Sequence, residues 1–187
     1  MTTPATSDAN TPDSGDQPLS VDLYWSFRSP YSYLCIARYR ALAASHDVAI
    51  NLRPVYPLAI RQPDFFERNH PNWLGYTMRD MMRVAQFHGI PFGPPRPDPI
   101  AQNLMTREIA AEQPYIYRLT RLGQAASRRG KSLAFAHEAA QLIWGGAQDW
   151  HLGDHLAGAA RQILAVQYMH ALHFRLQCRH QRRTHQP

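Results

Sequence analysis

Cysteine is scarce in this chain of 187 residues, which contains only Cys35 and Cys178, far apart in the sequence. Dithiol exchange needs a nucleophilic thiolate and a nearby second thiol that resolves the mixed disulfide. The sequence contains neither a Cys-x-x-Cys pair nor a zinc-type cysteine cluster. The shortage therefore argues against a disulfide oxidoreductase. Because Cys35 occupies an apolar position of a predicted helix, we expect it to be a small buried hydrophobic residue.

Long apolar runs are also missing. No stretch approaches the roughly 18 to 20 residues that a transmembrane helix needs, so we expect no membrane partner. Residues 1–20 are rich in Thr, Ser, Asp and Pro and lack the basic and apolar regions of a signal peptide. We predict that they form a disordered leader. The length predicts one domain with a full core, and we expect a cytoplasmic protein.

Acidic residues are absent after Asp154, although the chain carries a net charge of +6. Arginines continue beyond that point and concentrate the positive charge in a C-terminal tail, residues 166–187, rather than on a binding face. We therefore do not expect nucleic acid as the main partner. One alternative stays open, in which the chain is an inactive fragment whose basic tail binds nucleic acid or nothing.

A short polar turn lies between a predicted strand and a predicted helix. Apolar and polar residues alternate over residues 21–28, and apolar residues recur at helical spacing from Leu34 onward. Ser29 suits the N-cap of that helix and Pro30 suits its first position. A hydroxyl here lies beside free backbone N–H groups and the positive end of a helix dipole. The turn is either a simple cap or a site for an anion.

The next segments predict a parallel βαβ unit followed by helices. Alternating apolar residues over 48–52 indicate a second strand that ends near Pro54. We expect a loop over residues 57–71, a helix over 72–88 and a proline-rich extended connector over 91–99. The apolar face predicted for that helix consists of Met78, Met81, Met82, Ala85 and Phe87.

Further helices are predicted in the second half of the chain. Residues 100–144 have a helical pattern that is broken near Pro114 and Gly130, which indicates two or three helices. Another helix is expected to begin at Asp154 and His155.

The sequence also contains a second candidate site, for a divalent metal, because His and carboxylate side chains can bind such ions. The candidates are His137, Glu138, His151, Asp154 and His155. Their spacing matches no common zinc motif, and His151 lacks the glutamate that follows the first histidine of a His-Glu-x-x-His motif. Histidines on helix surfaces explain the pattern better, so we predict no metal site.

Three segments together resemble one known family. Residues 27–34, residues 76–95 and residues 135–154 occur in the order found in the thioredoxin-like group that contains 2-hydroxychromene-2-carboxylate isomerases and kappa-class glutathione transferases, relatives of DsbA. The resemblance implies an α/β, thioredoxin-like (DsbA-like) fold over residues 21–165, with an all-helical insertion at about residues 72–150.

The resemblance stops after about residue 162. The family continues with a cis-proline turn, further strands and a final helix, whereas residues 167–187 are rich in His, Arg and Gln. This composition suggests a shifted reading frame, and we expect the C-terminal half of the sheet to be missing. A sheet without that half exposes an edge and an apolar face of its central strand.

The resemblance also implies a site and a reaction. Glutathione is the implied cofactor, and serine occupies both positions where redox relatives have cysteine. The implied roles are catalytic for Ser29, glutathione-binding for Ser29, Pro30, Asn69 and Asn72, and substrate-binding for Arg28, Tyr31 and Ser32. The implied substrate is a small aromatic or conjugated carbonyl compound, and the family also allows a homodimer.

The implied activity is that of a glutathione-dependent isomerase acting on 2-hydroxychromene-2-carboxylate or a similar compound in aromatic catabolism. In this reaction a thiolate adds reversibly to a conjugated carbon and permits rotation about the former double bond. A kappa-like glutathione transferase needs the same site and remains an alternative. A DsbA-like thiol-disulfide oxidoreductase is the other alternative, and the missing cysteine pair argues against it.

Overall fold

A parallel βαβ unit opens the fold. The computed structural model describes residues 19–103, 106 and 108–161. Strand β1 (Leu19–Trp25) pairs in parallel with β2 (Val48–Pro54), and α1 (Pro30–Ser45) connects the two strands. The predicted unit is thus confirmed, although β1 begins and ends slightly earlier than its alternation suggested.

The two faces of this small sheet differ in polarity. Trp25 and Leu52 are buried against the helices. On the opposite face, Asn51 donates a hydrogen bond to the Ser20 hydroxyl at 2.9 Å, and Arg53 pairs with Asp22 at 3.1 Å. This alternation is typical of a sheet with one buried face and one solvated face.

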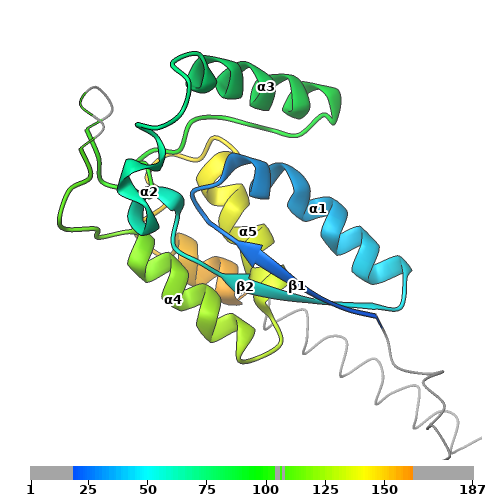
Figure 1. Cartoon of the computed structure of the whole chain (residues 1–187). Coiled ribbons are helices and arrows are strands. Elements are labelled where there is room, and N and C mark those ends of the chain that lie inside the picture. Colours follow the sequence, from blue (N-terminus) through cyan, green and yellow to red (C-terminus); the bar gives the residue numbers. More distant parts are fainter. Residues whose placement is uncertain (1–18, 104–105, 107, 162–187) are drawn as a thin grey trace, which may run out of the picture.

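Helices pack against the buried face of the sheet. α1, α4 and α5 all contact β2, and α5 contacts both α1 and α4. Figure 1 shows α3 lying apart from the strands, above the rest of the fold. Residues 155–161 are also helical. The remaining elements are α2 (Leu58–Arg61), the 3-10 helix η1 (Pro63–Phe65), α3 (Trp73–Phe87), α4 (Ile116–Ser127) and α5 (Ser132–Trp144).

Several sequence expectations need correction. The segment over residues 57–71 contains α2 and η1 rather than an unbroken loop. Residues 100–115 form no helix where they are described, and an antiparallel bridge joins Gln102 to Ile109. Cys35 is partly exposed rather than fully buried. Most of the predicted leader and all of the tail over residues 166–187 lie outside the described residues.

The predicted apolar face of α3 is only partly buried. Met81 and Ala85 lie in the core, whereas Met78, Met82 and Phe87 are exposed. The helix was located correctly, but its contact face is narrower than the sequence pattern suggested. Among the described residues, no helix is long and apolar enough to cross a bilayer.

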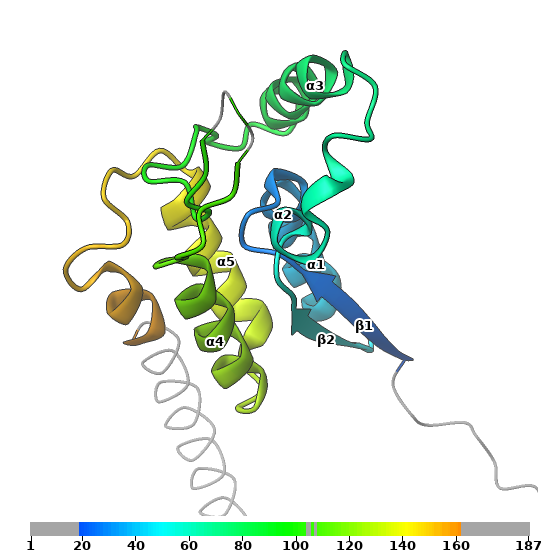
Figure 2. The ribbon, with the colours of Figure 1, turned by 60° about the vertical axis from the view of Figure 1, so that its left-hand side comes forward.

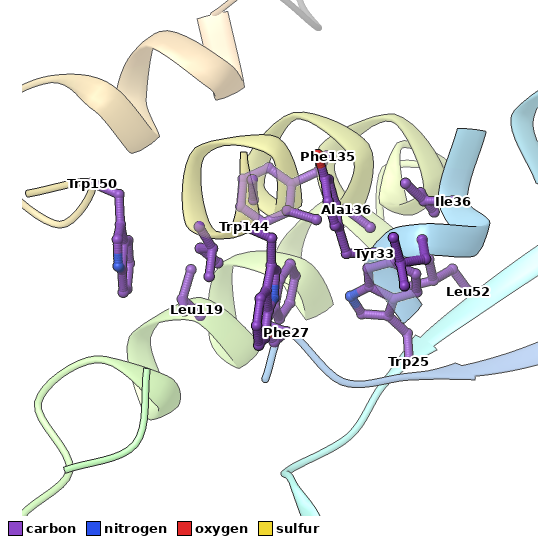
Figure 3. Packing of buried hydrophobic residues seen from close by; sticks show 14 of the residues in the cluster. Trp25, Phe27, Tyr33, Ile36, Leu52, Leu119, Phe135, Ala136, Trp144 and Trp150 are labelled. Atoms are coloured by element: carbon purple, nitrogen blue, oxygen red, sulfur yellow. The ribbon is translucent and has the colours of Figure 1, made fainter. Parts of the chain in front are cut away.

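Aromatic side chains form the centre of the core (Figure 3). Phe27 is 1% exposed and lies edge-on to Trp25 and to Phe135, with ring centroids 6.2 and 5.9 Å away. Phe27 belongs to the turn between β1 and α1, so this core fixes the place where the helix starts. Edge-to-face rings at these separations attract one another beyond the effect of simple burial.

Gly123 allows α4 to approach that turn closely. A Cβ atom at this position would lie 2.9 Å from Phe27 Cε2 and 3.0 Å from Pro54 Cγ. The Phe27 ring is enclosed by its aromatic neighbours and cannot move aside freely. Gly75 in α3 provides a contrast, because a Cβ atom there would have no neighbour within 4 Å.

Replacing each of these two glycines with alanine is expected to change stability in opposite directions. Gly75→Ala is expected to raise the free energy of unfolding by about 0.5 to 1 kcal/mol, because alanine favours helix more than glycine does. Gly123→Ala is expected to lower it by about 1 to 3 kcal/mol, because the new methyl group overpacks the core. Urea unfolding measures both changes, and stabilisation by Gly123→Ala would contradict the packing described here.

Candidate functional site

Ser29 caps the N-terminus of α1, as the sequence predicts. Its backbone is extended, with φ −87° and ψ 115°, and its Oγ accepts a hydrogen bond from the Ser32 N–H at 3.3 Å. The Ser29 N–H donates to the Ser26 carbonyl at 3.1 Å, which closes the turn after β1. Pro30 occupies the first turn of the helix, where its missing N–H costs nothing.

The capped end can still donate hydrogen bonds to a ligand. A serine hydroxyl has one donor and two acceptor positions, so Ser29 can accept from Ser32 and donate its own proton elsewhere. The Tyr31 N–H has no hydrogen-bond partner among the described residues. No acidic residue lies in the first turn of α1. The Ser29 hydroxyl, the Tyr31 amide and the helix dipole therefore favour an anion here.

Arg28 is held by an internal carboxylate. Its Nε donates to Asp98 Oδ1 at 2.6 Å, and its guanidinium lies 5.6 Å from the centroid of the Trp144 ring. Asp98 also accepts from the Ile100 N–H at 2.9 Å and from the Gln102 side chain at 3.3 Å. The positive charge expected to attract a substrate carboxylate is thus already paired within the chain, which leaves the other guanidinium N–H groups for a ligand.

The indole of Trp144 is hydrogen-bonded to the turn between β1 and α1. Its Nε1 donates to the buried carbonyl of Phe27 at 3.1 Å. Phe92 stacks on Trp144 with ring centroids 5.7 Å apart, and Tyr33 stacks on Phe92 at 6.3 Å. The Tyr33 hydroxyl donates to the Pro91 carbonyl at 2.5 Å. These contacts join α5 and the connector after α3 to the turn that carries Ser29.

Tyr31 connects the start of α1 to α3. Its hydroxyl donates to Asp80 Oδ2 at 2.6 Å. Partial burial, with the hydrogen bond and the negative charge of Asp80, raises the pKa of Tyr31 from 10.0 to about 12. The phenol therefore keeps its proton at neutral pH, and it cannot act as a base for a thiol there.

The two asparagines predicted to bind glutathione lie in the connection before α3. Asn69 is half-buried and donates to the Phe65 carbonyl at 3.0 Å. Asn72 is exposed at the N-terminus of α3 and places no side-chain cap on that helix. Within the described residues, no hydrogen bond joins either asparagine to the turn over residues 28–32. Their proposed role stays a prediction.

The histidines of the rival metal site are dispersed. His137 Nδ1 lies 3.0 Å from Glu138 and 2.8 Å from Arg40. The His151 ring lies against Tyr115, and Asp154 pairs with Arg161 at 2.8 Å. In the part of the chain that the structure describes, no three His, Cys, Asp or Glu side chains gather as metal ligands.

A hollow of about 410 Å³ lies farther along α1. It is lined by Tyr33, Ile36 and Ala37 of α1, by residues 89–91, and by three residues of or just after α5, His137, Gln141 and Gly145. Ser29 and its neighbours over residues 28–32 do not line it. The hollow and the capped helix end are therefore separate features.

Sequence reasoning did not identify Asp80, Asp98 or Trp144 as parts of the site. Asp98 lies between two prolines in an extended connector, a pattern that gives no sign of a partner 70 positions away. Asp80 and Trp144 lie on helices where their residue types suggest an ordinary surface acid and a core aromatic. In the folded chain, Asp98 contacts Arg28, Asp80 contacts Tyr31, and Trp144 contacts Phe27.

The parallel βαβ unit, the helices on one face and the serine-capped turn at the start of α1 are features of a thioredoxin-like domain. The chain belongs to the family of DSBA-like thioredoxin domains, whose sequence model matches residues 20–163. The DsbA-like thioredoxin fold expected from the sequence is confirmed, whereas the predicted loss of the C-terminal half of the sheet concerns residues outside the described part of the chain.

A solved structure has the same fold. The chain is similar to a selenomethionine form of 2-hydroxychromene-2-carboxylate isomerase (HCCA isomerase), with a TM-score of 0.56 and 22% sequence identity. The match covers 78% of this chain and 66% of that one, so it spans slightly less than two thirds of that protein. No curated protein is significantly similar in sequence.

The contact between Tyr31 and Asp80 predicts a pH-dependent contribution to stability. Tyr31→Phe is expected to lower the free energy of unfolding at pH 7 by about 0.5 kcal/mol, a low value because the pair is exposed. Because the pKa of Tyr31 is raised in the folded state, the folded chain keeps the phenolic proton to a higher pH than the unfolded chain does. The contribution of Tyr31 to the free energy of unfolding is therefore complete below pH 10.0 and is lost as the pH approaches 12.

Chemical unfolding of wild type and Tyr31→Phe over this pH range measures the effect. Tyr24→Phe serves as the control, because Tyr24 is exposed on β1. Asp80→Asn is expected to move the pKa of Tyr31 back toward its ordinary value, which carbon NMR of the tyrosine rings can follow. An unchanged pKa in Asp80→Asn would contradict the contribution assigned to Asp80, whereas the part of the shift caused by burial is expected to remain.

Proposed function

We propose that this chain is a glutathione-dependent isomerase of the 2-hydroxychromene-2-carboxylate type. The main observation is the Ser29 hydroxyl, which caps α1 in a DSBA-like domain and retains a proton to donate. The structural likeness to an HCCA isomerase supports the same reaction class. The small aromatic or conjugated carbonyl substrate is part of the proposal.

The thiol end of glutathione fits the capped helix. The Ser29 hydroxyl and the unpartnered Tyr31 N–H can both donate to a thiolate. Donation to the charged form stabilises it and lowers the pKa of a thiol. Ser29 and Pro30 would hold the sulfur end, and Asn69 and Asn72 are proposed to hold the peptide.

Bound glutathione would supply a thiolate that adds reversibly to a conjugated carbon. Ser29 contributes a fixed donor that, unlike cysteine, cannot form a mixed disulfide. Ser32 offers a second hydroxyl one turn along the helix. Arg28 can orient a substrate carboxylate with the N–H groups that Asp98 does not use, since a guanidinium has five of them. Tyr31 stays protonated, and because its proton is donated to Asp80, its hydroxyl oxygen would act as an acceptor toward a ligand.

A kappa-like glutathione transferase is a second candidate. A hydroxyl that stabilises the glutathione thiolate would serve a transferase equally well. In that reaction the thiolate attacks an electrophile, and glutathione stays bonded to the product. The two activities differ in whether glutathione is recovered unchanged. The DsbA-like oxidoreductase is not favoured, since residues 29 and 32 are both serine and Cys35 lies a full turn farther along α1.

Changing the Ser29 side chain tests its role as a donor. Ser29→Ala removes the donor and the cap, whereas Ser29→Asp keeps the capping oxygen but adds a negative charge. Both are expected to lower kcat for isomerisation about 100-fold or more, the usual loss when one donor to a developing anion is removed. Because Ser29→Asp preserves the cap, its stability is expected to stay near that of wild type.

Ser45→Ala is the matched control at the opposite end of α1. Ser45 is exposed and donates to the Ala41 carbonyl at 2.8 Å. Its removal is expected to leave isomerisation unchanged. Full activity in Ser29→Ala would disprove the proposed mechanism. Consumption of glutathione in step with product would favour the transferase.

A sulfur at position 29 gives a readout that is independent of activity. Ser29→Cys is expected to react with oxidised glutathione and gain one glutathionyl group, because the helix N-terminus favours a thiolate. Mass spectrometry measures the adduct, with wild type as the control for the native cysteines. Ser45→Cys, at the negative end of the same helix, is expected to react more slowly. Equal rates would argue against glutathione binding at Ser29.

A further inference from the structure

The hollow along α1 has three walls that come from separate parts of the chain. Tyr33, Ile36 and Ala37 of α1 form one wall, residues 89–91 form the second, and residues at the end of α5 form the third. Figure 2 shows α5 beside α1, with α3 above them. A volume of about 410 Å³ is typical of small-molecule sites, and a dry cavity of about 150 Å³ is enough for benzene. The hollow therefore has room for a compound of one or two rings.

Hydrogen bonds hold the wall after α3 in place. Gly89 has a left-handed backbone, with φ +62°, and the Ile90 N–H donates to the Ala85 carbonyl at 2.9 Å, which closes the end of the helix. The Pro91 carbonyl accepts from the Tyr33 hydroxyl at 2.5 Å, so this wall is bonded directly to α1. The hollow is thus formed before any ligand binds, as small-molecule sites usually are.

The lining of the hollow offers no acidic or strongly basic side chain. None of the described residues in it is Asp, Glu, Lys or Arg. Burial raises the pKa of the Tyr33 phenol above its ordinary value of 10.0, so Tyr33 stays neutral at pH 7. Arg40 and Glu138 contact His137 outside the lining and lie 3.7 Å apart, where their charges offset each other. A charged ligand group would find no opposite charge in the hollow, and burying an unpaired charge is costly.

Two helix ends add to the case against an anion. α3 ends at Phe87 and α5 ends at Trp144, and Gly89 and Gly145 in the lining follow these ends closely. The C-terminal end of a helix carries a partial negative charge, which repels a carboxylate. A cation is attracted by these partial charges, but the lining has no carboxylate to replace its lost hydration. A neutral ligand therefore fits the hollow best.

One polar side chain in the lining has hydrogen-bonding groups to spare. His137 Nδ1 lies 2.8 Å from Arg40 and 3.0 Å from Glu138, so it is already engaged. The Gln141 amide nitrogen lies 3.2 Å from His137 Nε2. A side-chain amide has two N–H donors and an acceptor oxygen, so Gln141 keeps both kinds of group for a ligand. A hydroxyl also donates and accepts, and it therefore matches this amide.

We propose that the hollow binds a small neutral compound that has one or two rings and a hydroxyl group, such as a phenol. The rings lie against the apolar side chains of α1 and of Ile90 and Pro91, and the hydroxyl contacts the Gln141 amide. Burial of the rings supplies most of the affinity, because removal of apolar surface from water is the main favourable contribution. The amide sets the orientation.

This site is distinct from the capped helix end. Residues 28–32 do not line the hollow. The proposed isomerisation needs a thiolate at Ser29 and a substrate carboxylate near Arg28, whereas the hollow favours a neutral ligand. Binding in the hollow does not depend on the proposed function.

An NMR titration of the full chain with 2-naphthol, which is neutral at pH 7, tests the proposal. Saturable shifts are expected for the backbone amides of Ala37, Ile90 and Gln141, with one molecule bound per chain. 2-Naphthoate has the same rings and a carboxylate in place of the hydroxyl. It is expected to bind about tenfold more weakly or worse, because its charge is unpaired in the hollow.

Filling the hollow is expected to weaken binding. Ala37 is exposed on α1 and lines the hollow, so Ala37→Phe is expected to raise the Kd of 2-naphthol about tenfold or more by occupying its place. Ala44→Phe is the matched control, because Ala44 is exposed on the same helix and lies outside the lining. Its Kd is expected to equal that of wild type. Circular dichroism checks that both variants are folded.

Replacing Gln141 separates the hydroxyl contact from the burial of the rings. Gln141→Leu keeps the backbone carbonyl that accepts from the Gly145 N–H at 2.8 Å, so the end of α5 is preserved. It is expected to raise the Kd of 2-naphthol about 3- to 10-fold, the usual effect of one hydrogen bond, and to leave the Kd of naphthalene unchanged. An equal loss for naphthalene would contradict the contact assigned to Gln141.

Other outcomes would overturn the site or its ligand class. The site is wrong if wild type shows no saturable binding of 2-naphthol, or if Ala37→Phe leaves its Kd unchanged. Shifts confined to the amides of Tyr31 and Ser32 would place the probe at the capped helix end instead. Binding of 2-naphthoate as tight as that of 2-naphthol would overturn the preference for a neutral ligand.

Discussion

The hydrogen bond from the Trp144 indole to the Phe27 carbonyl is the contact on which the rest of the site depends. It joins residues 117 positions apart and is buried. A buried carbonyl without a partner would cost about 1 to 3 kcal/mol, so the bond holds the turn after β1 against α5. The same turn contributes Phe27 to the aromatic core and Ser29 to the N-cap of α1. The position of the Ser29 hydroxyl is therefore fixed by packing that lies outside the site.

Two further contacts tie distant segments to this helix end. Asp98 pairs with Arg28, and Asp80 accepts from Tyr31. The connector after α3 and the helix α3 itself thus flank the start of α1. Each contact also changes the properties of a side chain at the helix end. Asp98 offsets the charge of Arg28, and Asp80 helps to keep the phenol of Tyr31 protonated. An anion near Ser29 is consequently favoured mainly by the helix end, and less by a free positive side chain.

Local signals in the sequence predicted the core of the fold well. The alternation before residue 26, the Ser29-Pro30 start and the apolar residues over 48–52 predicted the βαβ unit, because each depends on neighbours along the chain. The helix over Trp73–Phe87 was predicted for the same reason. The short helices α2 and η1 were missed, since the prolines and aromatics around them are equally typical of a loop.

The partners within the site could not be predicted from local signals. Ser29 was identified by its position between a strand and a helix, but Asp80, Asp98 and Trp144 reach its neighbours Tyr31, Arg28 and Phe27 only through long-range packing. The exposure of Met78 and Met82 likewise depends on how few elements contact α3, which helical periodicity does not reveal.

The most direct test of the central claim is an NMR titration of the full chain with reduced glutathione. The account predicts saturable shifts of the backbone amides of Tyr31 and Ser32, together with a lower pKa for the thiol of bound glutathione than for the free peptide. Ser29→Asp is expected to abolish both effects while the other amides keep their positions. Saturable binding that leaves Tyr31 and Ser32 unchanged, or no binding at all, would contradict the account.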